Sequence, residues 1–237
     1  MKGSISSIET MGLVDGPGIR LVFFLQGCPL RCLFCHNPET WERVEKTMMS
    51  PEEVLKKVLR YKNYFGEDGG VTFSGGEPLY QSAFLLETLK LLKENGIHTV
   101  IDTSGVSNYE GNKEEILKYV DLVLWDVKAI DEEGYKKMTG LSIKESLDFL
   151  ELCQRLNKKM WIRQVIVPGI NDTKEYILRL KEFVKPLKNI EKIELLPYHT
   201  MGIEKYKNLG LKYRLSGVEA MDKDRCKELE NLLKSEQ

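Results

Sequence analysis

Short apolar runs alternate with amphipathic segments along most of the chain, and this alternation predicts repeated strand–helix units. The runs have the length of buried strands and are bounded by Gly, Pro or polar residues. They cover residues 19–25, 71–73, 98–101, 122–125, 161–167 and 192–196. Six such units predict an α/β fold whose parallel strands are joined by right-handed crossovers. The sheet is expected either to curve into a partial barrel or to stay open and doubly wound.

The segments between the apolar runs carry helix-end signals. Ser50 followed by Pro51 and two glutamates is typical of a helix start, because serine caps free N–H groups and acids favour the positive end of the helix dipole. The predicted helices begin at residue 50 and cover 83–94, 113–119, 142–157, 173–184 and 222–234. Residues 198–218 show no period and are expected to form a loop. Without a repeat or linker, residues 1–237 are expected to form one domain.

The overall composition is that of an ordinary globular protein. Hydrophobic residues make up 42% of the chain and charged residues 30%, with 35 basic against 36 acidic side chains. This balance does not indicate nucleic acid or a lipid surface as the principal partner. The N-terminus lacks an apolar signal core, and no apolar run approaches the length of a membrane span. We therefore expect a cytoplasmic protein.

Three of the five cysteines lie within eight residues, at Cys28, Cys32 and Cys35. Four-iron clusters are normally held by four thiolates, so three on one loop favour a cluster with one iron open to a small molecule. Zinc bound by these cysteines and His36 is an alternative, although adjacent Cys35 and His36 are poorly placed to share one tetrahedral ion. Three unliganded thiols are a further alternative. The odd cysteine count argues against a disulfide framework.

Polar residues follow every predicted strand, at the end where parallel α/β proteins gather their functional groups. The cysteine loop follows the first strand. The later strands lead into, or contain, Ser74-Gly75-Gly76-Glu77-Pro78, Asp102-Thr103-Ser104-Gly105, Asp126-Val127-Lys128, Arg163 and Pro197-Tyr198-His199. Because the carboxyl ends of parallel strands meet at one edge, these groups are expected to share a site.

Each of these groups also has a structural interpretation. Gly75 and Gly76 allow a ligand to approach the backbone closely, and Glu77 suits an ammonium group, but a Gly-Gly pair is also an ordinary turn. Asp102 and Asp126 suit a cation, a ribose hydroxyl or a lysine, but strand-end aspartates also cap helices.

The remaining basic, histidine and cysteine residues also have either a functional or a structural interpretation. Lys128 and Arg163 supply positive charge suited to a carboxylate, and Arg163 is alternatively a structural ion-pair partner. Of the three histidines, His98 begins a strand and is expected to be structural. Outside the loop, Cys153 and Cys226 fall in helical patterns and are expected to be packing or surface residues.

The motif Cys-x3-Cys-x2-Cys, with Phe34 before the third cysteine and a Gly-Gly-Glu downstream, resembles the radical S-adenosylmethionine (SAM) superfamily. Longer blocks are similar to the family of pyruvate formate-lyase activating enzymes. These blocks are Val14–Arg20, Gln26–Cys28, Cys35–Pro38, Thr40-Trp41, Gly69–Thr72, Gly96–Thr99, Trp161–Arg163, Val167–Gly169 and Ile190–His199. The tail over residues 217–237 matches this family less well. Pro78-Leu79 after Gly-Gly-Glu is the form commoner in the superfamily as a whole, where the family's best-known member is expected to have a small apolar residue. The ferredoxin-like insert of other activases is missing.

The resemblance implies a fold, cofactors and partners. The fold would be a TIM-like partial (β/α)6 barrel, the radical SAM fold, with a [4Fe-4S] cluster whose open iron chelates SAM. One electron into the cluster would cleave SAM to methionine and a 5′-deoxyadenosyl radical, which abstracts a hydrogen from a backbone glycine of pyruvate formate-lyase. The resemblance further implies flavodoxin or ferredoxin as electron donor, a monomer, and a place in anaerobic glucose metabolism. The sequence does not decide between pyruvate formate-lyase and a closely related lyase as the partner.

The same resemblance implies roles for individual residues. The cluster, in the loop 28–35, would be held by Cys28, Cys32 and Cys35. SAM would be contacted by Phe34, Gly75, Gly76, Glu77, Asp126, Lys128 and His199. A monovalent cation would be bound by Asp102, Thr103 and Asp126. The glycine-bearing peptide would meet Asp15, His36 and Arg163. No side chain is expected to act as a general acid or base.

Two other functions remain open on the sequence. One is a radical SAM enzyme acting on a small molecule. The other is a module without catalytic activity that binds zinc or senses redox state through the three cysteines.

Overall fold

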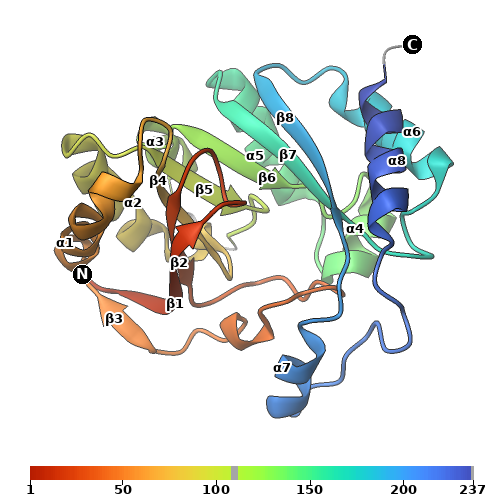
Figure 1. The fold of residues 1–237 in the computed structure, drawn as a ribbon, viewed down its shortest axis with the longest axis horizontal. Helices are drawn as coiled ribbons and strands as arrows, with labels where there is room; N and C mark the ends of the chain where they lie inside the picture. Colours follow the sequence, from red (N-terminus) through yellow and green to blue (C-terminus); the bar gives the residue numbers. More distant parts are fainter. Residues whose placement is uncertain (108–111, 236–237) are drawn as a thin grey trace.

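Eight strands form one sheet in the computed structural model, which describes residues 1–107 and 112–235 (Figure 1). Six of them run parallel: β2 (Arg20–Leu25), β4 (Gly70–Gly75), β5 (Thr99–Thr103), β6 (Leu122–Asp126), β7 (Lys159–Ile166) and β8 (Ile190–Pro197). The strand order is β3-β1-β2-β4-β5-β6-β7-β8. The six predicted strand–helix units are therefore confirmed, and the sheet is curved but not closed.

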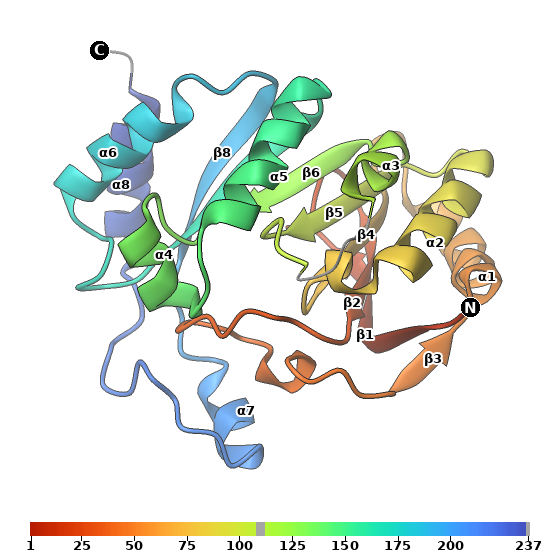
Figure 2. The ribbon, with the colours of Figure 1, turned by 180° about the vertical axis from the view of Figure 1, so that it is seen from behind.

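The parallel strands read as continuous apolar runs because they are covered on both faces. Helices cover the outer face, as Figure 2 shows for α2 (Ser82–Glu94), α3 (Lys113–Lys118) and α5 (Lys144–Arg155). Buried residues such as Phe23 and Phe73, whose rings stack at 5.6 Å, belong to the main core cluster. The inner face carries a smaller cluster of Val100, Leu122 and Leu124.

The helix-end signals act as predicted. In α1 (Pro51–Tyr61), the Ser50 side chain accepts from the Glu53 N–H, and the Glu53 side chain accepts from the Ser50 N–H. The remaining helices with predicted positions are α6 (Lys174–Val184) and α8 (Lys223–Lys234). Short 3-10 helices lie at η1 (Pro38–Thr40), η2 (Lys62–Tyr64) and η3 (Pro78–Gln81). Helix α8 packs on α6 and β8, so part of the tail 217–237 covers the far edge of the sheet; residues 236–237 lie outside the described residues.

Besides the 3-10 helices, two strands and two α-helices of the described residues were not predicted. Strands β1 (Gly3–Gly12) and β3 (Thr47–Met49) extend the sheet antiparallel beyond β2. Helix α4 (Glu132–Thr139) is capped by Asp131 and ends at Gly140, whose φ is +85°. Helix α7 (Ile203–Asn208) lies within residues 198–218, so the prediction of a loop throughout that segment is wrong. These short or polar elements depend on pairing and packing with distant segments, which local periodicity does not report.

A fully buried arginine joins the amino ends of the inner strands. The Arg20 Nε donates to the Thr72 hydroxyl at 3.0 Å, and its Nη2 donates to the Val71 carbonyl. Its Nη1 lies 3.2 Å from the His98 Nδ1. Burial lowers the pKa of Arg20 to about 10, so the guanidinium remains a donor at neutral pH and His98 must accept through an unprotonated Nδ1. His98 is therefore structural, as expected.

No helix among residues 1–107 and 112–235 is long and apolar enough to cross a membrane.

Candidate active site

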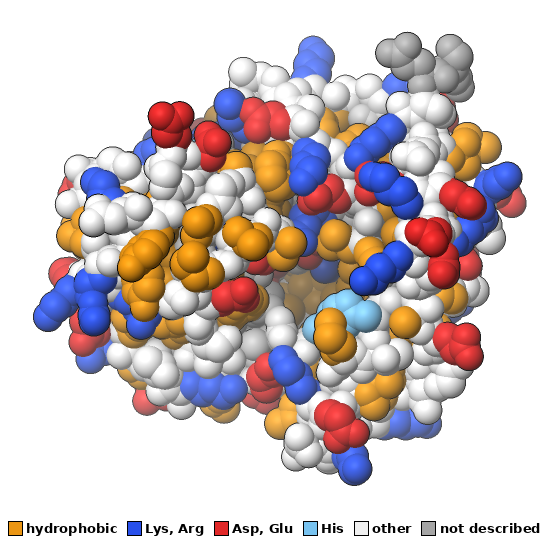
Figure 3. All heavy atoms as spheres, in the orientation of Figure 1, with side chains coloured by type: hydrophobic (Ala, Val, Ile, Leu, Met, Phe, Trp, Pro, Cys, Tyr) orange, Lys and Arg blue, Asp and Glu red, His pale blue; other side chains and the backbone are white. Residues whose placement is uncertain are grey.

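A cavity of about 220 Å³ opens at the carboxyl ends of the parallel strands. Figure 3 shows the molecule hollowed at its centre, with a pale-blue histidine at the margin of the hollow. Every parallel strand contributes to the wall through its end or the loop that follows it. The lining includes Cys28, Cys32, Phe34, Cys35, His36, Ser74, Gly75, Gly76, Glu77, Asp102, Thr103, Ser104, Asp126, Lys128, Arg163 and Leu196. The cavity brings together residues from five of the six expected groups, whereas Pro197-Tyr198-His199 is outside its lining and β8 contributes Leu196 instead.

The cysteine loop is held in place by backbone hydrogen bonds from other elements. The Arg31 and Leu33 N–H groups donate to carbonyls at the end of α4, at 2.8 and 2.9 Å. Burial raises the pKa of all three loop thiols, and that of Cys32 reaches about 12. Such thiols become thiolates only when a strong positive charge binds them, and an iron centre supplies it. All three cysteines also line one cavity, which favours a metal cluster over three unrelated packing thiols.

The zinc alternative receives no support from the geometry. In the part of the chain that the structure describes, no group of three or more His, Cys, Asp or Glu converges on a single-ion site. His36 instead directs its Nε2 to the carbonyl of His199, 3.0 Å away, where the imidazole must be the donor. Thiolates that bind different irons of a cluster need not converge on one point. Three cysteines lining one cavity fit a [4Fe-4S] cluster.

Lys128 is the central cation beside the cysteine loop. Its Nζ lies 2.7 Å from the Asp126 Oδ2 and 5.4 Å from the centre of the Phe34 ring. Burial lowers the pKa of Lys128, but Asp126, Cys32 and Asp102 together outweigh this and raise it above its ordinary value. The lysine therefore stays charged and lines the cavity together with Phe34 and Asp126.

Glu77 is buried and accepts four hydrogen bonds from its own chain. One oxygen accepts from the Thr103 hydroxyl and from the Leu79 N–H at 3.2 Å, and the other accepts from the Ser104 N–H at 2.9 Å and hydroxyl at 2.7 Å. Burial raises the pKa of Glu77 to about 7, although these bonds lower it. Glu77 therefore ties the end of β4 to the end of β5, a task that the sequence did not indicate. Contact with SAM stays a prediction.

Gly75 and Gly76 are required by close backbone packing. Gly75 has φ +107°, and a Cβ at Gly76 would lie 2.2 Å from the carbonyl oxygen of Gly27. The Gly76 and Glu77 N–H groups donate to the Leu25 and Gly27 carbonyls, each at 2.9 Å. The two glycines thus bring the β4 loop against the start of the cysteine loop.

Asp102 and Arg163 lie together in the cavity wall. The Arg163 Nη1 lies 3.6 Å from the Asp102 Oδ2, which also accepts from the Ser74 hydroxyl at 2.8 Å. Burial and the neighbouring Asp126 raise the pKa of Asp102 to about 6. The buried Asp102 Oδ1 has no hydrogen-bond partner among the described residues. An unpaired carboxylate oxygen in a cavity is suited to an ammonium group or a metal cation.

Thr103, another expected ligand of the cation, already uses its hydroxyl in hydrogen bonds within the protein. Its hydroxyl donates to Glu77 and accepts from the Gly105 N–H at 2.9 Å. Asp126 is paired with Lys128. Of the three expected cation ligands, Asp102 is the one with a buried unpaired oxygen in this structure.

His36 and His199 stack face to face, with ring centres 3.7 Å apart and planes inclined by 14°. Burial lowers the pKa of both, and that of His36 falls to about 4. Both rings are therefore neutral at pH 7. His36 lines the cavity, whereas His199 is outside its lining and has a buried Nδ1 without a hydrogen-bond partner among the described residues. Asp15 is outside the lining, but the charge of Arg163 acts on its carboxylate.

Sequence reasoning gave no role to three residues that contribute to the site. Ser74 holds Asp102, Ser104 holds Glu77, and Trp41 donates to the sulfur of Cys35. The two serines adjoin motif residues, which was a weak signal for them. No local pattern indicated the role of Trp41, because its contact with Cys35 depends on how the loop folds back.

The chain matches the profile of the Radical SAM superfamily over residues 22–184. It is 55% identical over 233 residues to a pyruvate formate-lyase-activating enzyme of Clostridium pasteurianum, covering 98% of this chain and 97% of that one. A relative of the same name from Staphylococcus epidermidis is 46% identical, covering 96% and 94%. A crystal structure of a radical SAM methyltransferase from Sphaerobacter thermophilus has a TM-score of 0.66 at 14% identity, covering 90% and 63%, and shows the same fold. The chain belongs to the radical SAM superfamily, and within it to the family of pyruvate formate-lyase-activating enzymes.

Members of this superfamily use a [4Fe-4S] cluster and SAM. The lining of the cavity fits both, because three thiols and several charged strand-end groups share it.

Proposed function

We propose that this chain activates pyruvate formate-lyase by removing a hydrogen atom from one backbone glycine of that enzyme. The observation that carries the proposal is the single cavity shared by Cys28, Cys32, Cys35 and the charged strand ends. The names of the relatives, which match over nearly the full chain, supply the partner. Residues 1–237 would act as one radical SAM domain in the cytoplasm.

The cysteine loop would hold the cluster through Cys28, Cys32 and Cys35. When bound, the cluster would supply one electron for cleavage of the S–C5′ bond of SAM to methionine and a 5′-deoxyadenosyl radical, and that radical would remove the glycine hydrogen. Buried walls on both sides of the cavity limit the access of water to that radical.

The chain's own groups would bind and orient SAM. Gly75 and Gly76 present backbone at the cavity wall, and Glu77 fixes that backbone relative to β5. The charged Lys128 suits the carboxylate of the methionyl group, and Phe34 offers an apolar face to the adenine. The unpaired Asp102 Oδ1 suits a cation beside SAM. Asp126 holds Lys128, and Thr103 holds Glu77.

The glycine loop would enter past Arg163, His36 and Asp15. Both stacked histidines are neutral at pH 7, so the His36–His199 pair offers an uncharged surface to a backbone segment. Arg163 carries a positive charge in the cavity wall, and its Nε, 4.0 Å from the Glu194 Oε2, makes no hydrogen bond to the described residues. It is therefore suited to a peptide carbonyl.

Electrons would come from flavodoxin or ferredoxin, and the active form would be a monomer.

The test is anaerobic reconstitution of the full chain with iron and sulfide, followed by addition of SAM, dithionite and a short peptide carrying the glycine loop. A glycyl-radical EPR doublet on the peptide is expected. SAM cleavage without the doublet would favour a small-molecule substrate. Cys32→Ala is expected to lose SAM cleavage, while Cys153→Ala, in the core away from the loop, keeps it. A site without iron that ignores SAM would overturn the proposal.

A further inference from the structure

The side chain of Trp41 contacts one of the proposed cluster ligands directly. Its indole Nε1–H donates to the Sγ of Cys35 over 3.3 Å. The 3-10 helix η1 places it there, because the Trp41 N–H donates to the Pro38 carbonyl at 3.1 Å. The Trp41 carbonyl in turn accepts from the Cys28 N–H, also at 3.1 Å. Trp41 therefore touches the first and the third cysteine of the loop.

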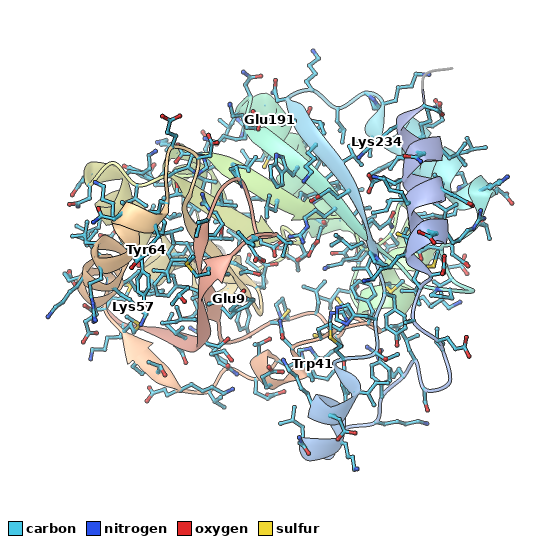
Figure 4. The ribbon with its side chains drawn as sticks, viewed as in Figure 1. Glu9, Trp41, Lys57, Tyr64, Glu191 and Lys234 are labelled. Carbon is cyan, nitrogen blue, oxygen red and sulfur yellow. The ribbon has the colours of Figure 1, made fainter. Side chains whose placement is uncertain are left out.

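The indole ring is held by two further residues, so the direction of its N–H is determined. The guanidinium of Arg31 lies 5.0 Å from the ring centre, and its Nη1 donates to the Cys28 carbonyl at 2.7 Å. The ring of Tyr206 in α7 meets the indole edge-on, at 5.6 Å and 83°. Figure 4 shows Trp41 between the cysteine-loop side of the molecule and α7. The Tyr206 hydroxyl donates to the Cys35 carbonyl at 3.1 Å.

A hydrogen bond to a cluster thiolate changes the energy of reduction. When an external reductant transfers one electron, the cluster and its thiolates gain one negative charge, while Trp41 gains no electron and loses no proton. A donor stabilises the more negative state more strongly, so it raises the reduction potential.

We propose that Trp41 is a positioning residue that raises the reduction potential of the [4Fe-4S] cluster by donating its indole N–H to the sulfur of Cys35. The inference rests on the cluster part of the proposed function and not on the identity of the partner enzyme. It makes the cluster easier to reduce by a biological one-electron donor.

The first experiment compares the full-length protein with Trp41→Phe, after anaerobic reconstitution to equal iron and sulfide content. Each protein is titrated with dithionite and redox mediators, and the reduced cluster is counted by EPR. At a fixed solution potential, the ratio of reduced to oxidised cluster is expected to fall roughly three- to tenfold in Trp41→Phe. For a one-electron couple this corresponds to about 30–60 mV.

Two variants serve as controls. Tyr206→Phe removes the bond to the Cys35 carbonyl but keeps the ring against Trp41, and Trp161→Phe makes the same substitution on β7, beside Lys192. Both are expected to keep the wild-type ratio. An unchanged ratio in a fully loaded Trp41→Phe, or an equal shift in Tyr206→Phe, would overturn the proposal.

The second experiment uses the wild-type protein, so it does not depend on whether a variant binds the cluster. Protein grown with tryptophan labelled with ¹⁵N in the indole ring is reconstituted and reduced, and pulsed EPR searches for a ¹⁵N coupling to the cluster. A coupling supports the bond to Cys35, and its absence in the wild type overturns it. If the coupling is absent, the protein can still form the glycyl radical. If the proposed function fails although the cluster is bound, the coupling can still be observed. The two failures are therefore distinguishable.

Discussion

Glu77 and Ser104 join the ends of two neighbouring strands through a single carboxylate oxygen. That oxygen accepts from the Ser104 N–H at 2.9 Å and from its hydroxyl at 2.7 Å. The two residues are 27 positions apart in the chain, and both lie in the cavity wall. The shape of the wall therefore depends on a buried acid whose four acceptor positions are used by its own protein.

Glu77→Gln is expected to lower the free energy of unfolding by about 1–3 kcal/mol, because the amide nitrogen of glutamine faces donors and leaves buried groups unpaired. Chemical denaturation of the apo protein measures it. Glu87→Gln, on the exposed face of α2, is the control and should change little. Equal effects of the two substitutions would contradict this account of Glu77.

The same variant is expected to change how stability depends on pH. Burial raises the pKa of Glu77 from 4.5 to about 7, so the folded state binds the proton more tightly than the unfolded chain. Glu77 therefore lowers stability as pH rises from about 4.5 to about 7. Unfolding free energies across this range should rise more steeply with pH in Glu77→Gln than in the wild type. Parallel curves would contradict the assignment.

His98 is expected to lower stability on the acid side. Burial and the charge of Arg20 lower its pKa, so the unfolded chain binds the proton more tightly. Stability is then lost as pH falls below the unfolded value of 6.5. His98→Asn keeps an acceptor for Arg20 but cannot titrate, and should lose less stability between pH 7 and 5 in denaturation experiments. An identical loss in both proteins would rule His98 out as the cause.

Lys128→Met is expected to destabilise the protein by roughly 1.5–3 kcal/mol, because it leaves the Asp126 carboxylate without its charged partner in the cavity. The double variant Lys128→Met with Asp126→Asn should recover part of this loss in the same denaturation assay. Lys144→Met, which breaks an exposed pair with Asp148, should change the stability little. No recovery in the double variant would argue against coupling between Lys128 and Asp126.

Gly76→Ala is expected to cost about 1–3 kcal/mol, because its Cβ would meet the Gly27 carbonyl at 2.2 Å and force backbone to move. Gly169→Ala is the matched control, since its φ is +74° but no atom lies within 4 Å of the new Cβ. It should lose about 1 kcal/mol from backbone strain alone. The comparison is made by thermal or chemical unfolding, and a smaller loss at Gly76 would contradict the packing argument.

Much of the site was predictable because its residues are grouped in short motifs at strand ends. The cysteine loop, Gly75-Gly76-Glu77 and the strand-end aspartates all lie in one cavity, as their positions after parallel strands indicated. The stack of His36 on His199 was not predictable, since it joins loops 163 residues apart. Nor was α7, whose Tyr206 is buried against Trp41 although its own segment is mostly exposed and polar.

The six parallel strands and the edge at which the functional residues gather follow from local sequence patterns, because burial on both faces of a strand leaves a local apolar run. The three-cysteine loop is equally local, since its spacing is a property of adjacent residues. Which atoms pair within the cavity does not follow from local patterns. Whether Glu77 meets a ligand or Ser104, and whether Trp41 reaches the sulfur of Cys35, depends on side-chain directions set by segments distant in the chain.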